Sequence, residues 1–290
     1  RKVDRVRALP ASQRKTMPGT APQHEIAKRI ASAVVLAIVA LGAVIVSPWS
    51  FAVLVVVAGT IVAWEWGKLV RGNGTDLIAF VVAFTVAIIA VLATLGKIDT
   101  ALVIVAISFA AVAALSLGSQ NWSWSVLGLG YAALPAFALA WLRGDPTLGL
   151  AALLYLLAVA WTTDTASYAA GRLIGGPKLA PAISPKKTWS GLIVGTIAPA
   201  IVGYATSLFL KDTSGLRLAL VSVAIAAFCQ LGDLSESAVK RKFGTKDMSQ
   251  LIPGHGGLLD RIDGLLFASL AAALIALRDP SSPGRGLLIW

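Results

Sequence analysis

Charged residues are scarce in this chain, and their scarcity excludes a water-soluble fold. Asp, Glu, Lys and Arg make up 13% of the 290 residues, about half the share of a soluble domain. Hydrophobic residues make up 57%, and they gather in long apolar runs. Because a backbone surrounded by lipid must satisfy its hydrogen bonds within each segment, these runs predict helices. The sequence therefore predicts an all-α integral membrane protein.

Cysteine and histidine are almost absent, which excludes two further classes. A single cysteine, Cys229, rules out an internal disulfide. Of the two histidines, His24 lies in a basic tail, and His255 has no cysteine or second histidine near it in the sequence, so a zinc site is not expected. The basic residues flank apolar runs without interleaved aromatics, so no nucleic acid is expected as a partner. The formal net charge of +11 instead favours anionic head groups or phosphate substrates.

Nine apolar segments predict a polytopic bundle of about nine transmembrane helices. Each segment can cross about 30 Å of hydrocarbon as a helix of roughly 20 residues, the shortest with help from its flanks. They lie near 30–47, 51–68, 77–95, 101–117, 125–142, 149–170, 189–210, 216–232 and 263–277. We expect a basic, disordered cytoplasmic tail at 1–29, N-terminal helices at 30–142 and C-terminal helices carrying the site at 143–290.

The distribution of basic residues predicts an orientation. With nine spans and a cytoplasmic N-terminus, 19 of the 25 Lys and Arg residues face the cytoplasm and 6 face the other side. This asymmetry follows the positive-inside rule. Both large polar stretches, 171–188 and 233–262, then face the cytoplasm.

The second polar stretch carries most of the chemistry. Its charges lie at helical spacing, in the order Asp233, Glu236 or Ser237, and Lys240, followed by Asp260 and Asp263 three residues apart. Carboxylates from two helix ends suit a hard cation such as Mg²⁺, which takes oxygen ligands and shares substrate phosphates. The alternative is an interfacial network of salt bridges among the same charges.

Three further features are candidates for binding. The run Pro253-Gly254-His255-Gly256-Gly257 predicts a backbone that approaches a partner closely, with amides suited to an anion, or else a tight turn before the last span. Lys186 and Lys187 suit a triphosphate or lipid phosphate, or form an ordinary cytoplasmic pair. Asp164 lies inside an apolar span and is a functional candidate by default. Glu65, between two tryptophans nearer a helix end, is expected to be interfacial.

These motifs resemble the phosphatidate cytidylyltransferase family, also called CDP-diacylglycerol synthases. The resemblance is carried by Ser237, Lys240, Arg241, Lys246, Asp247, Pro253, His255, Gly256, Gly257, Asp260, Arg261 and Asp263. The segment around Asp164 and the runs 178–181 and 184–189 also look like family motifs, whereas residues 1–140 resemble the family only as apolar spans. Ser167 and Gly264 depart mildly from the expected residues without removing a charge.

The resemblance implies the reaction of CTP with phosphatidate to give CDP-diacylglycerol and pyrophosphate. It implies a dimeric enzyme of a bacterial inner membrane that needs Mg²⁺, with room for a second cation, held by Asp233 and Asp260. The implied catalytic residues are Asp233, Lys240, Asp260, Arg261 and Asp263. The implied substrate-binding residues are Asp164, Ser184, Lys186, Lys187, Thr188, Ser237, Arg241, Lys246, His255, Gly256 and Gly257.

Two other functions are consistent with parts of the sequence. A transferase using CTP and an isoprenoid or ether lipid would keep the same chemistry, because nothing in the sequence specifies the acyl chains. An ion-coupled transporter is suggested by the many spans and by Asp164. Transporters usually spread polar groups over two related halves near the midplane, whereas here they gather in two loops on one side.

Overall fold

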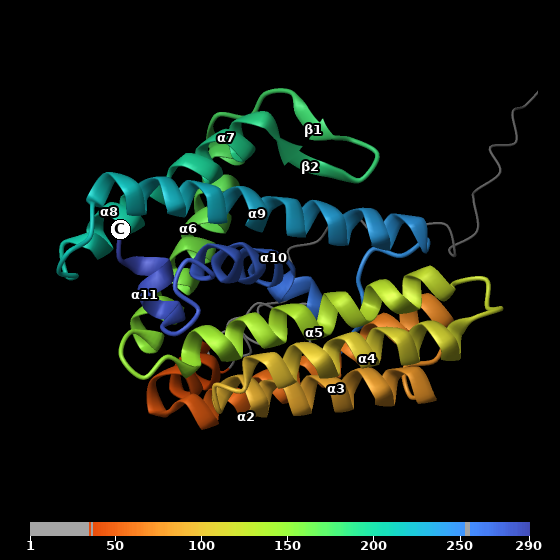
Figure 1. Ribbon diagram of the computed structural model, residues 1–290. Coiled ribbons are helices and arrows are strands. Elements are labelled where there is room, and N and C mark those ends of the chain that lie inside the picture. Colours follow the sequence, from red (N-terminus) through yellow and green to blue (C-terminus); the bar gives the residue numbers. More distant parts are fainter. Residues whose placement is uncertain (1–34, 36, 253–255) are drawn as a thin grey trace, which may run out of the picture.

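The computed structural model describes residues 35, 37–252 and 256–290, which form a bundle of helices with one small hairpin (Figure 1). Among the described residues, a short helix, Ala37–Val46, comes first. The elements that follow are α2 (Pro48–Arg71), α3 (Leu77–Thr94), α4 (Ile98–Ser116), α5 (Trp122–Gly144), α6 (Gly149–Leu173), β1 (Lys178–Ala180), β2 (Ser184–Thr188), α7 (Trp189–Ile197), α8 (Ala200–Ser207), α9 (Gly215–Lys242), α10 (Leu259–Ala276) and α11 (Pro283–Leu288).

The membrane class is confirmed, but the count of nine spans is not. Within the described residues seven helices are long and apolar enough to cross a membrane: α2 to α6, α9, and the stretch Trp189–Ser207 that contains α7 and α8. Ala37–Val46 is shorter than a span requires. The 18-residue α10 begins with the charged residues Asp260, Arg261 and Asp263. Pro199 marks the break between α7 and α8, because proline cannot donate a backbone hydrogen bond inside a helix.

Helix α10 joins two groups of helices. In Figure 1 it lies between α9 and α5, and it packs against both. Helices α2 to α5 pack among themselves on one side, while α6 to α9 pack on the other. Small residues allow close approach, as expected where van der Waals packing drives helix association in lipid. A Cβ added at Gly264 of α10 would lie 2.7 Å from Cys229 Sγ of α9, and that cysteine is buried.

Two polar segments differ from the expected loops. The stretch 171–188 contains an antiparallel hairpin that pairs Lys178 with Thr188. The apolar segment 216–232 lies within α9, and the helix continues beyond it to Lys242, so Asp233, Glu236 and Lys240 lie on one helix as their spacing predicted. No Gly or Pro interrupts 233–242, and the helix ends just before Gly244, whose φ is +70°.

The two polar segments lie at the same end of the bundle. Arg241 Nε donates to the Ile183 carbonyl oxygen at 3.1 Å, and Lys187 Nζ lies 2.6 Å from an Asp233 carboxylate oxygen. The hairpin therefore packs beside the C-terminal part of α9. Which side of a membrane this end faces stays a prediction.

The opposite end of the bundle is fastened by another carboxylate. Asp145, between α5 and α6, is 4% exposed. Its Oδ2 accepts hydrogen bonds from Ser282 Oγ at 2.6 Å and from Gly284 N at 3.0 Å, and its Oδ1 accepts one from Leu148 N at 2.8 Å. It thereby ties the start of α11 to the start of α6.

Candidate functional site

A polar cavity of about 690 Å³ opens at the hairpin end of the bundle. That volume lies in the range of small-molecule sites. It is bounded by residues of α6, β1, β2, α7, α9 and α10, namely Asp164, Ser167, Tyr168, Gly171, Arg172, Lys178, Leu179, Lys186, Lys187, Thr188, Gly191, Leu192, Gln230, Asp233, Lys240, Asp260, Arg261 and Asp263. Six of these side chains are basic and four are acidic, which favours an anionic ligand.

The cavity brings together nine of the residues selected from the sequence, which come from four elements and span 100 residues of the chain. They are Asp164, Lys186, Lys187, Thr188, Asp233, Lys240, Asp260, Arg261 and Asp263. Ser184, Ser237, Arg241 and Lys246 are not among the lining residues, and Gly256 and Gly257 lie beside Asp260. His255 lies outside the described residues.

Asp260 is held in place by three donors. Lys240 Nζ lies 2.7 Å from Oδ1, while the backbone amides of Met248 and Gly257 donate to Oδ2 at 2.9 and 2.8 Å. Its carboxylate therefore enters the cavity with a defined orientation.

Lys240 is shared between two carboxylates. It forms an ion pair with Glu236, one helical turn before it on α9, as well as with Asp260 on α10. The sequence left open whether Glu236 or Ser237 shares a face of α9 with Lys240. Glu236 does, because it is fully buried and contacts Lys240. Because both partners are largely buried, removing one of them would leave an uncompensated charge, which costs more than breaking an exposed ion pair.

Asp233 connects α9 to the hairpin through its 2.6 Å ion pair with Lys187. Asp164 from α6 and Asp263 from α10 line the same cavity. Three carboxylates from three helices thus share one space with Lys187. Like charges gathered in this way repel each other unless cations or donors compensate them.

The cavity-facing side of α6 includes two residues that sequence reasoning missed. Tyr168 and Arg172 follow Asp164 at steps of four residues and line the same cavity. Arg172 Nη1 donates to the Tyr168 hydroxyl at 2.8 Å. The spacing from Asp164 was the signal that would have found them.

Thr188 connects the hairpin to α7. Its hydroxyl accepts a hydrogen bond from Gly191 N at 3.2 Å and forms the N-cap of the helix. Helix α7 then packs closely on α6, since a Cβ at Gly191 would lie 2.8 Å from the Ser167 carbonyl oxygen. The glycine therefore allows the two helices that border the cavity to approach.

The described part of the glycine run does approach its neighbours closely. Gly256 has φ of +86°, and a Cβ there would lie 3.0 Å from Asp260 Oδ2. A Cβ at Gly257 would collide with the Glu65 carboxylate. The Gly257 amide donates to Asp260, so this amide is engaged by the protein itself.

Glu65 is the largest departure from the sequence analysis. It was expected at the interface, but its side chain is fully buried. It accepts hydrogen bonds from Ser249 Oγ at 2.6 Å, Leu258 N at 2.9 Å and Leu259 N at 2.8 Å. A lone carboxylate within an apolar run was the same signal that selected Asp164, and the neighbouring tryptophans obscured it.

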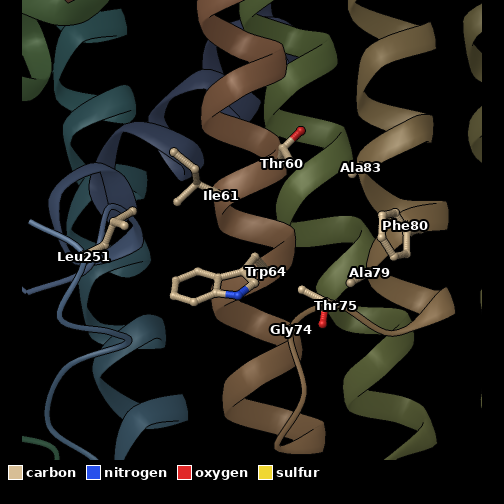
Figure 2. A pocket seen from close by; sticks show the side chains of 9 residues that line it. All are labelled: Thr60, Ile61, Trp64, Gly74, Thr75, Ala79, Phe80, Ala83 and Leu251. Carbon is tan, nitrogen blue, oxygen red and sulfur yellow. The ribbon is translucent and has the colours of Figure 1, made fainter.

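A second hollow, of about 360 Å³, lies between α2, α3 and the loop before α10 (Figure 2). Thr60, Ile61, Trp64, Gly74, Thr75, Ala79, Phe80, Ala83 and Leu251 line it. No charged side chain is among these lining residues, so the hollow offers no group for phosphate chemistry.

The chain is similar to known proteins over most of its length. The model of the cytidylyltransferase family matches residues 27–277. A phosphatidate cytidylyltransferase of Brucella suis biovar 1 is 38% identical over 253 residues, covering 86% of this chain and 91% of the relative. Proteins of the same name from Haemophilus influenzae and Staphylococcus haemolyticus are 44% identical over 129 residues and 47% identical over 120 residues, covering 43% and 41% of this chain and 45% and 46% of the relatives.

Proposed function

The chain belongs to the cytidylyltransferase family, and we propose that it transfers the cytidylyl group of CTP to phosphatidate, giving CDP-diacylglycerol and pyrophosphate. The observation that carries the proposal is the polar cavity at the end of apolar helices, with basic side chains around a group of carboxylates. Such a cavity suits one substrate that is soluble and a second that stays in the lipid.

The reaction needs little covalent chemistry from the protein. An oxygen of the phosphatidate phosphate attacks the α-phosphorus of CTP and forms the new P–O bond. The bond from that phosphorus to the bridging oxygen breaks, and pyrophosphate leaves with the electron pair. Because the attacking oxygen is already anionic, no activated Ser or Cys is required. The protein contributes alignment and charge stabilisation.

Basic residues on opposite walls would bind the phosphates. Lys186 and Lys187 come from the hairpin, and Arg261 comes from the first turn of α10. Lys240, held between Glu236 and Asp260, presents its charge at a fixed place. Phosphate oxygens gathered between these groups would lose part of their mutual repulsion.

The donor set of the cavity fits Mg²⁺. Asp233 and Asp260 would hold the ion, with Asp263 in the same cavity. Within the described ranges no three His, Cys, Asp or Glu side chains form a ready-made metal group. Mg²⁺ does not need one, because it is usually bound by one or two carboxylates together with waters and substrate phosphates. When bound it would neutralise phosphate charge.

The surroundings of the enzyme are part of the proposal. We place the chain in a bacterial inner membrane with its cavity facing the cytoplasm, where CTP is dissolved. We also expect a homodimer.

Pyrophosphate release tests the activity. The purified chain is mixed with CTP, Mg²⁺ and phosphatidate in detergent micelles, and we expect pyrophosphate together with a CDP-lipid. Omission of phosphatidate or Mg²⁺ should abolish release, and ATP should not replace CTP. Parallel reactions with an isoprenoid phosphate and an ether-linked phosphatidate identify the lipid. Turnover of the isoprenoid phosphate alone would contradict the proposal.

A further inference from the structure

We propose that Glu65 of α2 is a positioning residue for the reaction, and that it acts by fixing the loop that orients Asp260. This inference rests on the proposed function. It gives the N-terminal group of helices a part in catalysis, although the motifs selected from the sequence lie at Asp164 and beyond.

Glu65 supplies a helix cap from a distant part of the chain. The N-cap residue of α10 is Leu258, which makes no side-chain cap hydrogen bond. The first amides of a helix have no partner within it, and here the amides of Leu258 and Leu259 donate to the two oxygens of Glu65. A carboxylate at this place also interacts favourably with the helix dipole. Glu65 is separated from these amides by more than 190 residues of sequence.

Glu65 and Asp260 bind adjacent residues of the same loop. On one side, Met248 N donates to Asp260 and Ser249 Oγ donates to Glu65. On the other, Gly257 N donates to Asp260 and Leu258 N donates to Glu65. The two carboxylates therefore fix the loop together at both ends, and a shift at Glu65 would move the donors that orient Asp260.

The part of α2 that carries Glu65 is buried and packs on α5. The next residue, Trp66, is 2% exposed and donates from Nε1 to the Trp124 carbonyl oxygen at 2.8 Å. Its ring stacks on Tyr131, with centroids 4.9 Å apart. Residues 65 and 66 thus connect the loop before α10 to helix α5.

The main test is Glu65→Gln, which keeps the shape but places an amide donor against a backbone donor. We expect kcat to fall at least tenfold while KM for CTP changes less than threefold. The substitution disturbs the loop but leaves the basic side chains proposed to bind the phosphates in place. Hydrogen exchange of the amides in 248–252 and 256–259 should become faster, because a buried group loses its hydrogen-bond partner. Exchange in α3 and α4 should not change.

Asp145→Asn is the matched control. Asp145 is also a buried carboxylate that accepts helix-start amides and a serine hydroxyl, but it lies at the opposite end of the bundle. This variant should lose some thermal stability and keep kcat within twofold. The inference would be overturned if Asp145→Asn had the same melting temperature as Glu65→Gln and lost as much kcat.

Ser249→Ala provides a second variant that removes one of the three donors to Glu65. It should speed exchange of the same loop and lower kcat at least twofold, and it decides the matter if Glu65→Gln does not fold. Wild-type exchange and wild-type kcat in Ser249→Ala would contradict the inference. Hydrogen exchange of the loop is measured without substrate. An inactive wild-type protein would therefore reject the proposed function, while the contact between Glu65 and the loop could still be tested.

Discussion

The ion pairs of the cavity differ in surroundings from an ordinary ion pair at the surface. Asp233 and Asp260 contact Lys187 and Lys240 within a cavity. Asp279 faces Arg285 at 3.7 Å, with the arginine side chain 67% exposed. Breaking an exposed pair costs about 0–1 kcal/mol of stability, whereas loss of a group that acts in the transition state lowers the rate.

Substitution of the two cavity carboxylates tests this distinction. We expect Asp233→Asn and Asp260→Asn each to lower kcat at least a hundredfold, about 2.7 kcal/mol, because each removes a charge proposed to hold Mg²⁺. Higher Mg²⁺ should restore part of the rate. Initial rates of pyrophosphate release measure both effects. Asp279→Asn is the control and should keep the wild-type rate. If both cavity variants keep more than a tenth of the rate, the shared cation site is wrong.

Asp145 predicts a pH dependence of stability. Burial raises its pKa, but hydrogen bonds from Ser282, Leu148 and Thr147 outweigh that effect and hold the pKa below its usual value of 3.8. A carboxyl group with a lowered folded-state pKa stabilises the fold above pH 3.8, and this contribution is lost as pH falls through the folded pKa. Asp145→Asn should therefore cost about 1 kcal/mol at neutral pH, because hydrogen bonds to a charged group are stronger than those to a neutral amide. Melting temperatures across pH should show that difference shrinking below 3.8, and a constant difference would contradict the assignment.

At the scale of elements, local composition predicted the helices well and their ends less well. Apolar runs indicated α2 to α6 because each run must satisfy its own hydrogen bonds in lipid. Helix α9 continues past its apolar segment, as the helical spacing of its charges indicated, but that spacing did not predict that the helix ends at Lys242. The signal for continuation was the lack of Gly and Pro before Gly244 and the four-residue spacing of Glu236 and Lys240.

The hairpin could not be located from the sequence, since its place depends on distant contacts. The same holds for Glu65, whose partners come from a loop far along the chain. Motif residues in contrast were gathered as expected, with Lys186, Lys187 and Asp260 in one cavity. Sequence patterns report local constraints well. A buried polar contact between distant segments appears in the sequence only as a charged residue in an apolar run, and its partner cannot be identified from the pattern.

Arg241 anchors the hairpin and supplies a prediction at this scale. Its Nε donates to the Ile183 carbonyl and its Nη1 to the Thr245 carbonyl, each at 3.1 Å. Arg241→Lys keeps the charge but cannot make both bonds. Because the hairpin carries Lys186 and Lys187, KM for CTP should rise about three- to tenfold, with less change in kcat. Steady-state kinetics measure this, with Arg217→Lys as control. An unchanged KM would show that the hairpin is held by its other contacts.

On the scale of the whole molecule, one end of the bundle carries the chemistry and the other is fastened by Asp145. At the chemical end lie the hairpin, the C-terminal part of α9 and the start of α10. At the other end, the last residues of α3 lie beside Gly144, since a Cβ there would lie 3.3 Å from the Ala93 carbonyl oxygen. A membrane protein of this form must present the two ends to different compartments.

Cysteine labelling tests that orientation. Cys229 is buried and can be replaced first by alanine. Lys242, at the end of α9, and Lys97, after α3, are both exposed and lie at opposite ends of the bundle. Arg143 also belongs to the far end, but at 6% exposed it is a poor labelling site. In sealed inverted vesicles, a membrane-impermeant maleimide should label Lys242→Cys, and in intact spheroplasts it should label Lys97→Cys. The positive-inside asymmetry supports this arrangement, and so does the need for dissolved CTP to reach the cavity.

Labelling of both positions from one side would show that the two ends are not in different compartments. Labelling in the reverse sense would keep the bundle but turn the cavity away from the cytoplasm, and the proposed access of CTP would then be wrong.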